Sequence, residues 1–267
     1  MSGSWPLPGG LPPGRLIVAD PRYAYGEPVT EPVLWVTDHL VPDAGSLWAR
    51  LLAEHHVTGL WPLMLIPMLP IDRLRPWHTA ELSPFPASAA EELDAGELLA
   101  TGWMLATTDT EGVGAPVLPD PPYSSWPGLA PPGTRGADPD QHAIDLATAP
   151  GGAVALTGVD EPPYLGLVPS GDGAGAISAC GWWTKGGAPP ELTAIVRSWQ
   201  ERFGARLCSL SKSTLYLAVA WPPATLEHAR RVAAEHWAFC PDIGSFEGFD
   251  EYAEGLVAAQ VWSFYWE

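Results

Sequence analysis

Prolines and glycines are concentrated in the middle of this chain, and they confine regular structure largely to the segments on either side. Between residues 112 and 163 they form clusters such as Pro119-Asp120-Pro121-Pro122 and Ala130-Pro131-Pro132-Gly133. Proline lacks a backbone N–H and its ring clashes with a continuing helix, so such clusters interrupt helices and strand ladders. The sequence therefore predicts a flexible leader at 1–14, an N-terminal α/β half at 15–112, a Pro/Gly-rich connection at 113–163 and a C-terminal domain at 164–267.

The spacing of apolar residues predicts strands and helices in the N-terminal half. We expect a strand near 33–37, a helix from about 46 to 55 and a buried strand near 60–66. Ser88 and Glu91 have the spacing of a capping box, in which both side chains accept hydrogen bonds from free backbone N–H groups at a helix start. They predict a helix that runs to about residue 100, and we expect a further strand at 103–107.

The C-terminal domain has a more regular pattern. A helix is expected to end at Gly204, because the preceding apolar residues recur at helical spacing and glycine can adopt the left-handed conformation that closes a helix. A hairpin over 206–220, a helix over 226–240, a shorter helix near 249–256 and a strand at 262–266 follow. Helices interleaved with short strands predict an α/β or α+β fold, with packed helices on a mixed or largely antiparallel sheet.

Four sequence blocks resemble a known family. They are Thr58-Gly59-Leu60-Trp61-Pro62-Leu63, the segment from Arg197 to Arg206, Glu235-His236-Trp237-Ala238-Phe239-Cys240-Pro241-Asp242 and the terminal Val261-Trp262-Ser263-Phe264-Tyr265-Trp266-Glu267. In this order they resemble the bacterial domain-of-unknown-function family numbered 4253, most clearly over residues 164–267. The resemblance implies a fold family and carries no established activity.

The net charge of the chain limits the classes of molecule that it can bind. The chain has 31 acidic and 13 basic residues, which give a formal net charge of −18. Such a surface repels the phosphates of nucleic acids and anionic lipids and attracts basic proteins, although high acidity can also serve solubility alone. We therefore expect no nucleic-acid binding and a basic protein partner, with the oligomeric state left open.

Hydropathy and cysteine content predict a cytoplasmic protein. The most apolar run, Leu60 to Leu69, is interrupted by prolines and is about half the length needed to cross a bilayer, so no membrane association is expected. The leader lacks the basic and apolar regions of a secretion signal. Cys180, Cys208 and Cys240 are odd in number and widely spaced, which argues against a disulfide framework.

His236 and Cys240 are the first candidates for chemistry. Four residues apart on a helix, they point the same way and could provide two zinc ligands or a Cys–His nucleophile pair. Cys240 also falls within the apolar stripe of the helix, where a free cysteine packs as a small hydrophobic group, while Glu235 is expected on the opposite, solvated face. His55 and His56 could complete a metal site with them if the two halves fold together.

A second cluster lies in the connection, where Asp138, Asp140, His142 and Asp145 could attract a hard cation. The cluster lacks the spacing of a calcium loop. Capping of a short helix is the simpler interpretation of Asp138 and Asp140. We predict no cofactor.

Tryptophan is unusually frequent, with 14 residues in the chain. Trp199, Trp237, Trp262 and Trp266 occupy apolar positions and are expected in the core with their N–H groups bonded internally. Trp182, Trp183, Trp126 and Trp221 lie outside such positions and are the candidates for an exposed binding surface, with a lid over the core as the alternative.

These observations favour a non-catalytic protein-interaction module, such as an immunity or regulatory protein that binds a basic partner. The alternatives are a metal-dependent or Cys/His enzyme, or a small-molecule sensor, centred on His236 and Cys240. In either alternative those two side chains would have to reach a ligand or a metal ion.

Overall fold

The structure is a computed structural model that describes residues 5–68, 72–108, 118, 122–245 and 248–267. These residues form one open sheet of seven strands in the order β1-β2-β4-β3-β5-β6-β7. The strands are β1 (Gly14–Ile17), β2 (Leu34–Thr37), β3 (Leu60–Leu65), β4 (Tyr164–Pro169), β5 (Ala205–Leu210), β6 (Thr214–Val219) and β7 (Val261–Tyr265). Only the β3–β5 pair is parallel within this sheet, so the prediction of a mixed, largely antiparallel sheet is confirmed.

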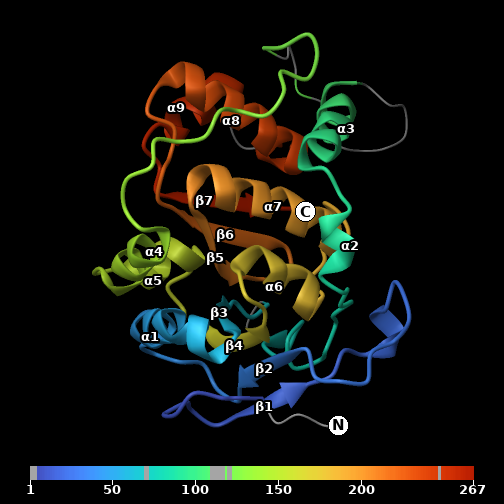
Figure 1. Cartoon of the computed structure of the whole chain (residues 1–267), viewed down its shortest axis with the longest axis vertical. Helices are drawn as coiled ribbons and strands as arrows, with labels where there is room; N and C mark the ends of the chain where they lie inside the picture. Colours follow the sequence, from blue (N-terminus) through green and yellow to red (C-terminus); the bar gives the residue numbers. More distant parts are fainter. Residues whose placement is uncertain (1–4, 69–71, 109–117, 119–121, 246–247) are drawn as a thin grey trace.

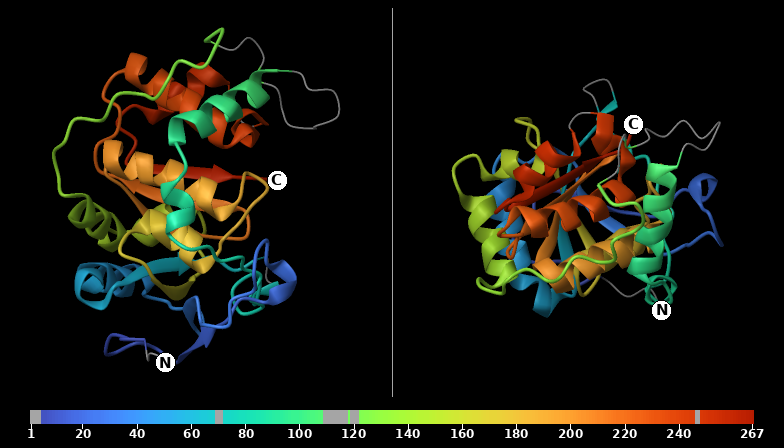
Figure 2. Two further views of the ribbon diagram at one scale, coloured as in Figure 1. Left: turned by 45° about the vertical axis from the view of Figure 1, so that its right-hand side comes forward. Right: turned by 90° about the horizontal axis from the view of Figure 1, so that it is seen from above.

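Helices pack on both sides of the central strands (Figure 1, Figure 2). The α-helices of the described residues are α1 (Ala44–Thr58), α2 (Ser88–Glu91), α3 (Ala95–Thr107), α4 (Pro139–Thr148), α5 (Gly152–Thr157), α6 (Gly173–Cys180), α7 (Pro189–Phe203), α8 (Leu226–Phe239) and α9 (Phe249–Leu256). Short 3-10 helices occupy Pro21–Tyr23 and Pro241–Ser245. Within the described part, none of these helices combines the length and apolarity that a bilayer crossing requires.

The N-terminal and C-terminal halves contribute strands to the same sheet. Strand β3 from the first half lies between β4 and β5 from the second, with Pro62 opposite Leu167 on one side and Met64 opposite Ser209 on the other. Side chains from both halves therefore share one continuous core. This arrangement places α1 and α4 side by side, although they are far apart in the sequence.

The C-terminal strand is paired as the sequence predicts. Trp262 lies opposite Leu217 and Phe264 opposite Leu215, so β7 is hydrogen-bonded to β6 along its length. The side chains of Trp262, Phe264 and Trp266 are buried, as are those of Trp199 and Trp237. Trp199 stacks on Phe264 with ring centroids 5.1 Å apart. The core position expected for these tryptophans is confirmed.

The internal bonding expected for the core indole groups holds only in part. Trp199 donates its Nε1–H to Glu235. In contrast, the buried Nε1 atoms of Trp237, Trp262 and Trp266 have no hydrogen-bond partner among the described residues. Each of these three side chains therefore buries a large apolar ring while its indole N–H lacks an acceptor.

Two predictions in the N-terminal half are wrong. Ser88 lies inside α2 and makes no capping bond, because Ala87 occupies the position before the helix. The segment 103–107 is the end of α3 and not a strand. Asp94 caps α3 by accepting a hydrogen bond from Glu97 N, and the buried Leu99, Trp103 and Ala106 recur at helical spacing.

The connection contains two helices in its described part, α4 and α5. Asp138 accepts a hydrogen bond from the backbone N–H of Gln141 at 2.9 Å, and Pro139 begins the helix. This confirms the interpretation of Asp138 as a helix cap. The capping interpretation of Asp140 is wrong, because its side chain points across to His55 of α1 and Arg206 of β5.

Candidate functional site

Four charged or titratable side chains converge where α1, α4 and β5 meet. His55 and His56 come from the last turn of α1, Asp140 from the first turn of α4 and Arg206 from β5. His55 is buried in the core, whereas the side chain of His56 is 72% exposed. We call these four residues the His–Asp–Arg cluster.

Asp140 is the centre of this cluster. Its Oδ2 atom lies 3.2 Å from Nε2 of His55 and 3.5 Å from Nε2 of His56. Its Oδ1 atom accepts a hydrogen bond from Nε of Arg206. Each carboxylate oxygen therefore faces a different set of partners, with the arginine on one side and both imidazoles on the other.

Electrostatics keep Asp140 ionised. Burial raises the pKa of this carboxyl, but the hydrogen bond and charge of Arg206 and the hydrogen bond of His55 outweigh burial and lower the pKa overall. Among the described residues, Nδ1 of His55 has no hydrogen-bond partner. The ring of His55 is instead held by an edge contact with Trp61, whose centroid is 5.0 Å away.

The His–Asp–Arg cluster brings together residues from the two candidate metal sites that the sequence analysis kept apart. His55 and His56 meet Asp140, and a group of potential metal ligands within the described residues contains these three and not His236 or Cys240. Of the other members of the acidic cluster, Asp145 accepts a hydrogen bond from Gln141, while burial lowers the pKa of His142. The hypothesis that His55 or His56 joins His236 is wrong, because α1 and α8 lie in different parts of the fold (Figure 1).

His236 is enclosed by aromatic rings. Trp262, Phe264 and Trp199 surround it with centroid distances of 4.5, 4.8 and 5.1 Å. Its Nδ1 lies 2.9 Å from the hydroxyl of Tyr252. Burial lowers the pKa of His236 to about 3, with a further contribution from the charge of Arg202. The imidazole is therefore neutral at physiological pH.

Cys240 is also buried and its thiol has a backbone partner. The Sγ–H donates to the carbonyl oxygen of Tyr265 at 3.0 Å. Burial raises the pKa of Cys240 to about 12, whereas a nucleophilic cysteine needs a lowered pKa. His236 bonds Tyr252 and not this thiol, so the two side chains do not form the hydrogen-bonded pair that nucleophilic catalysis uses.

Glu235 is not on a solvated face, and that expectation is wrong. Its side chain is fully buried and accepts hydrogen bonds from Arg202, from Nε1 of Trp199 and from the backbone N–H of Ala130. The side of α8 that carries Glu235 packs against the chain before α4, so solvent does not reach it. These contacts connect α7, α8 and the Pro/Gly-rich connection.

The four tryptophans proposed as a binding surface contact different parts of the fold. Trp182 is only 1% exposed and donates to the carbonyl oxygen of Ser211, so its expected exposure is wrong. The other three are half-buried. Trp126 packs beside Trp103, and Trp221 donates to the carbonyl oxygen of Ala137. As partner contacts, Trp183, Trp126 and Trp221 stay predictions.

Trp183 is already covered by a cation. The ammonium of Lys212 lies 3.6 Å from its ring centroid, and the ring of Tyr25 meets it edge-on. Burial lowers the pKa of Lys212, which the charge of Glu81 partly opposes. These contacts show that at least one face of the indole is used within the molecule.

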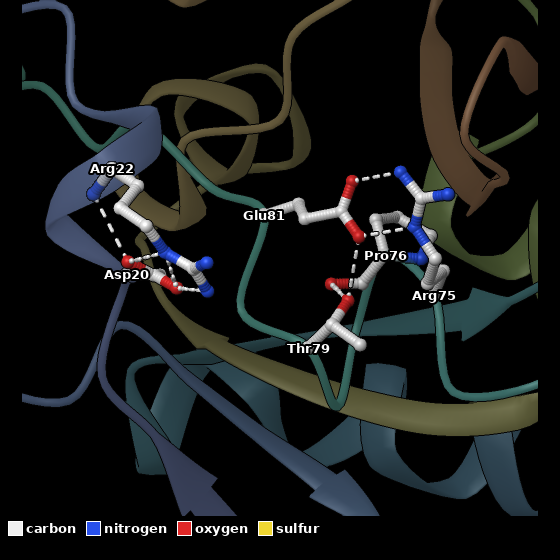
Figure 3. Close-up of polar contacts among 6 residues, drawn as sticks. All are labelled: Asp20, Arg22, Arg75, Pro76, Thr79 and Glu81. Atoms are coloured by element: carbon white, nitrogen blue, oxygen red, sulfur yellow. Dashed lines mark hydrogen bonds and ion pairs between the residues drawn. The ribbon is translucent and has the colours of Figure 1, made fainter.

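Glu81, whose charge acts on Lys212, belongs to a polar network (Figure 3). It is buried and accepts hydrogen bonds from both Nε and Nη2 of Arg75 and from the hydroxyl of Thr79. Asp20 and Arg22 form a separate exposed pair nearby in the same view. The hydrogen bond from Arg75 lowers the pKa of Glu81 against the effect of burial. The carboxylate is fully engaged, and we assign this network a structural role.

Acidic side chains gather on α2, α3 and the turn between them. Glu91, Glu92, Asp94 and Glu97, which we call the α2–α3 acidic surface, are all exposed. Residues 88–107 contain no lysine or arginine. A groove of about 390 Å³ beside this surface is lined by Glu91, Asp94 and Glu201, with Arg197 and the exposed Leu129.

Together these features define a mixed α/β protein with an open sheet, a polar cluster on one side and an acidic surface on the other. Residues 164–267, from β4 to the C-terminus, match the model of a family described as a domain of unknown function (DUF4253). No curated protein and no solved structure matches the chain. Arg206, Glu235 and His236 lie in the matched segment, whereas His55, His56 and Asp140 lie before it.

Proposed function

We propose that this protein acts by binding a basic protein partner rather than by turning over a substrate, and that the partner docks on the α2–α3 acidic surface. The observation that carries the proposal is the distribution of ion pairs. Within the described residues, eight arginines are paired with carboxylates of the same molecule: Arg15, Arg22, Arg50, Arg73, Arg75, Arg202, Arg206 and Arg230. None of these pairs includes a carboxylate of the α2–α3 acidic surface.

The charge of this surface supports attraction of a basic partner at long range. Four carboxylates lie within seven residues of sequence, and Arg197 is the basic side chain that lines the adjoining groove. Unpaired like charges on one surface raise the local concentration of an oppositely charged protein and speed its association. The overall charge of −18 acts in the same direction.

Exposed apolar side chains on the same helix support the contact itself. Met104 is 55% exposed and Leu105 is 44% exposed, and both lie about two turns after Glu97 on α3. Desolvated apolar anchors contribute most of the affinity of a typical interface, while charges at the rim mainly affect the association rate. A basic segment with apolar side chains on one face would meet both requirements.

A catalytic function centred on His236 and Cys240 has less support. Both side chains are buried, the imidazole has a strongly lowered pKa and the thiol a strongly raised one. An immunity or regulatory protein that neutralises a basic partner is a class that agrees with the proposal.

The test compares two variants of equal charge. The first carries Glu91→Gln, Glu92→Gln and Glu97→Gln; the control carries Glu227→Gln, Glu251→Gln and Glu254→Gln, at exposed positions of α8 and α9. Each variant removes three negative charges, so an effect of net charge alone is the same in both. Wild type and variants are used to capture proteins from the native host, and the association rate of any captured protein is measured at low and high salt.

We expect the first variant to lose capture of a basic protein that the control retains. Raising the salt concentration should slow association of wild type, because screening shortens the range of the attraction. Equal capture by both variants, or capture of acidic proteins only, would contradict the proposal. Leu105→Ala should then speed dissociation with little effect on association.

A further inference from the structure

We propose that His55, His56 and Asp140 form a binding site for a divalent transition-metal ion of the zinc type. One ligand atom from each of these three residues lies within 4.8 Å of the other two. Imidazole nitrogens and a carboxylate oxygen are ligands that zinc accepts in proteins. The proposal is independent of the basic partner.

The separations agree with tetrahedral coordination. Zinc binds nitrogen and oxygen at about 2.0–2.2 Å, which places two ligand atoms of a tetrahedral ion about 3.3–3.6 Å apart. The Oδ2 atom of Asp140 lies 3.2 Å from Nε2 of His55 and 3.5 Å from Nε2 of His56. An ion can therefore be accommodated with small side-chain movements.

The position of His56 is a second observation that supports a metal site. Consecutive residues of a helix point about 100° apart, so their side chains normally diverge. The rings of His55 and His56 nevertheless lie with centroids 3.7 Å apart and approach the same carboxylate oxygen. The buried His55 needs a hydrogen-bond partner, and Asp140 is sufficient to explain its position. The exposed His56 could form its hydrogen bonds with water, so its approach to Asp140 needs another explanation. Convergence of both rings is the geometry that a shared ion requires.

Arg206 orients the carboxylate of the site. It binds Oδ1 of Asp140 and leaves Oδ2 directed at the imidazoles. Outer hydrogen bonds of this kind hold ligating groups in place. The charge of the guanidinium opposes a cation, so we expect weaker binding than at a structural zinc site with thiolate ligands. Three protein ligands, of which His56 is exposed to solvent, also leave a coordination position for water or a small anion.

The experiment titrates the full-length protein with Zn²⁺ by calorimetry and with Co²⁺ by visible absorption. His56→Ala is the decisive variant, because the exposed side chain can be removed without opening the core. His39→Ala is the matched control at another exposed histidine. Asp140→Asn is a second ligand variant, and its folding is checked by circular dichroism.

We expect one equivalent of metal to bind wild type and His39→Ala with the same affinity. His56→Ala should weaken binding at least about ten-fold, the scale on which even outer-shell changes act at metal sites. The Co²⁺ complex should lack the near-ultraviolet absorption of a cobalt–thiolate bond, which separates this site from one at Cys240. Binding that is absent in wild type, equal in His56→Ala and His39→Ala, or accompanied by thiolate absorption would overturn the proposal.

Discussion

Arg202 on α7 and Glu235 on α8 form a largely buried ion pair with two hydrogen bonds, which joins the two helices. The Nη1–Oε1 and Nη2–Oε2 distances are 2.8 and 2.7 Å. The same guanidinium donates to the carbonyl oxygen of Ala130, and the carboxylate accepts from the N–H of that residue. A segment without regular structure is thus anchored to two helices by one charge pair.

Removal of one partner should be strongly destabilising. Glu235→Ala leaves the Arg202 guanidinium without its counter-charge and the indole N–H of Trp199 without an acceptor. Breaking a buried pair in this way costs about 3–5 kcal/mol of unfolding free energy. Urea denaturation would measure the loss, with Glu254→Ala on the exposed side of α9 as a control expected to change stability by less than about 0.5 kcal/mol. Similar stabilities for the two variants would show that the pair is dispensable.

Adjacent residues of β7 should differ sharply in their contribution to stability. Phe264 is buried against Trp199, whereas Tyr265 is on the exposed side of the strand. Phe264→Ala should cost about 3–5 kcal/mol because it opens a cavity in the core, and Tyr265→Ala should cost considerably less. Thermal and urea unfolding would compare the stabilities of the two variants.

Deletion of residues 261–267 should abolish the cooperative unfolding transition altogether. A truncated protein that unfolds near the wild-type temperature would contradict the importance of this strand.

The C-terminal elements could be predicted because each follows from a local pattern. Helix α7 ends at Gly204, whose φ of 60° suits glycine, and the alternation of Trp262, Phe264 and Trp266 with polar neighbours identifies a strand with one buried face. By contrast, 103–107 has an apolar composition that a strand and a helix share. Its helical state depends on the cap at Asp94 and on packing against α8, at which Gly102 approaches so closely that a Cβ atom would lie 2.1 Å from the carbonyl oxygen of Ala238.

The site could be predicted less well than the fold, because it depends on contacts between distant segments. Glu235 lies opposite Cys240 on a helical projection, and a projection assigns the opposite side of a surface helix to solvent. Helix α8 is instead covered on that side by α3 and by the segment near Ala130, so its far face is buried as well. The meeting of His55 with Asp140 spans 85 residues and has no local signature.

The three cysteines should be inert in the folded protein. Burial raises the pKa of Cys180, Cys208 and Cys240 to about 12 in each case, so the reactive thiolate is scarce at neutral pH. A thiol reagent such as Ellman's reagent should label the native protein slowly and release three equivalents after denaturation. In Cys240→Ser the hydroxyl can still donate to Tyr265, and two equivalents are expected. Rapid labelling of one thiol in the native wild type would indicate an activated cysteine.

His236 should make stability depend on pH in a defined direction. Its pKa is about 3 in the folded protein, because it is buried near Arg202, and about 6.5 in the unfolded chain. Between these values the unfolded state binds a proton that native His236 does not, so the free energy of unfolding falls as the pH drops below about 6.5 and is unaffected by this group well above it. The slope from this residue approaches about 1.4 kcal/mol per pH unit.

The comparison with His236→Gln isolates this contribution. Glutamine does not titrate, whereas His78 and His142, whose pKa values burial also lowers, remain in both proteins. Urea unfolding from pH 7 to pH 4.5 should therefore show a shallower loss of stability in the variant than in wild type, and His39→Gln should behave as wild type. If His236→Gln does not fold, the imidazole resonance of His236 in the wild-type protein can be followed by NMR, and it should not shift down to pH 4.5. A normal titration near pH 6.5 would mean that solvent reaches His236 and that the aromatic enclosure formed by Trp199, Trp262 and Phe264 opens.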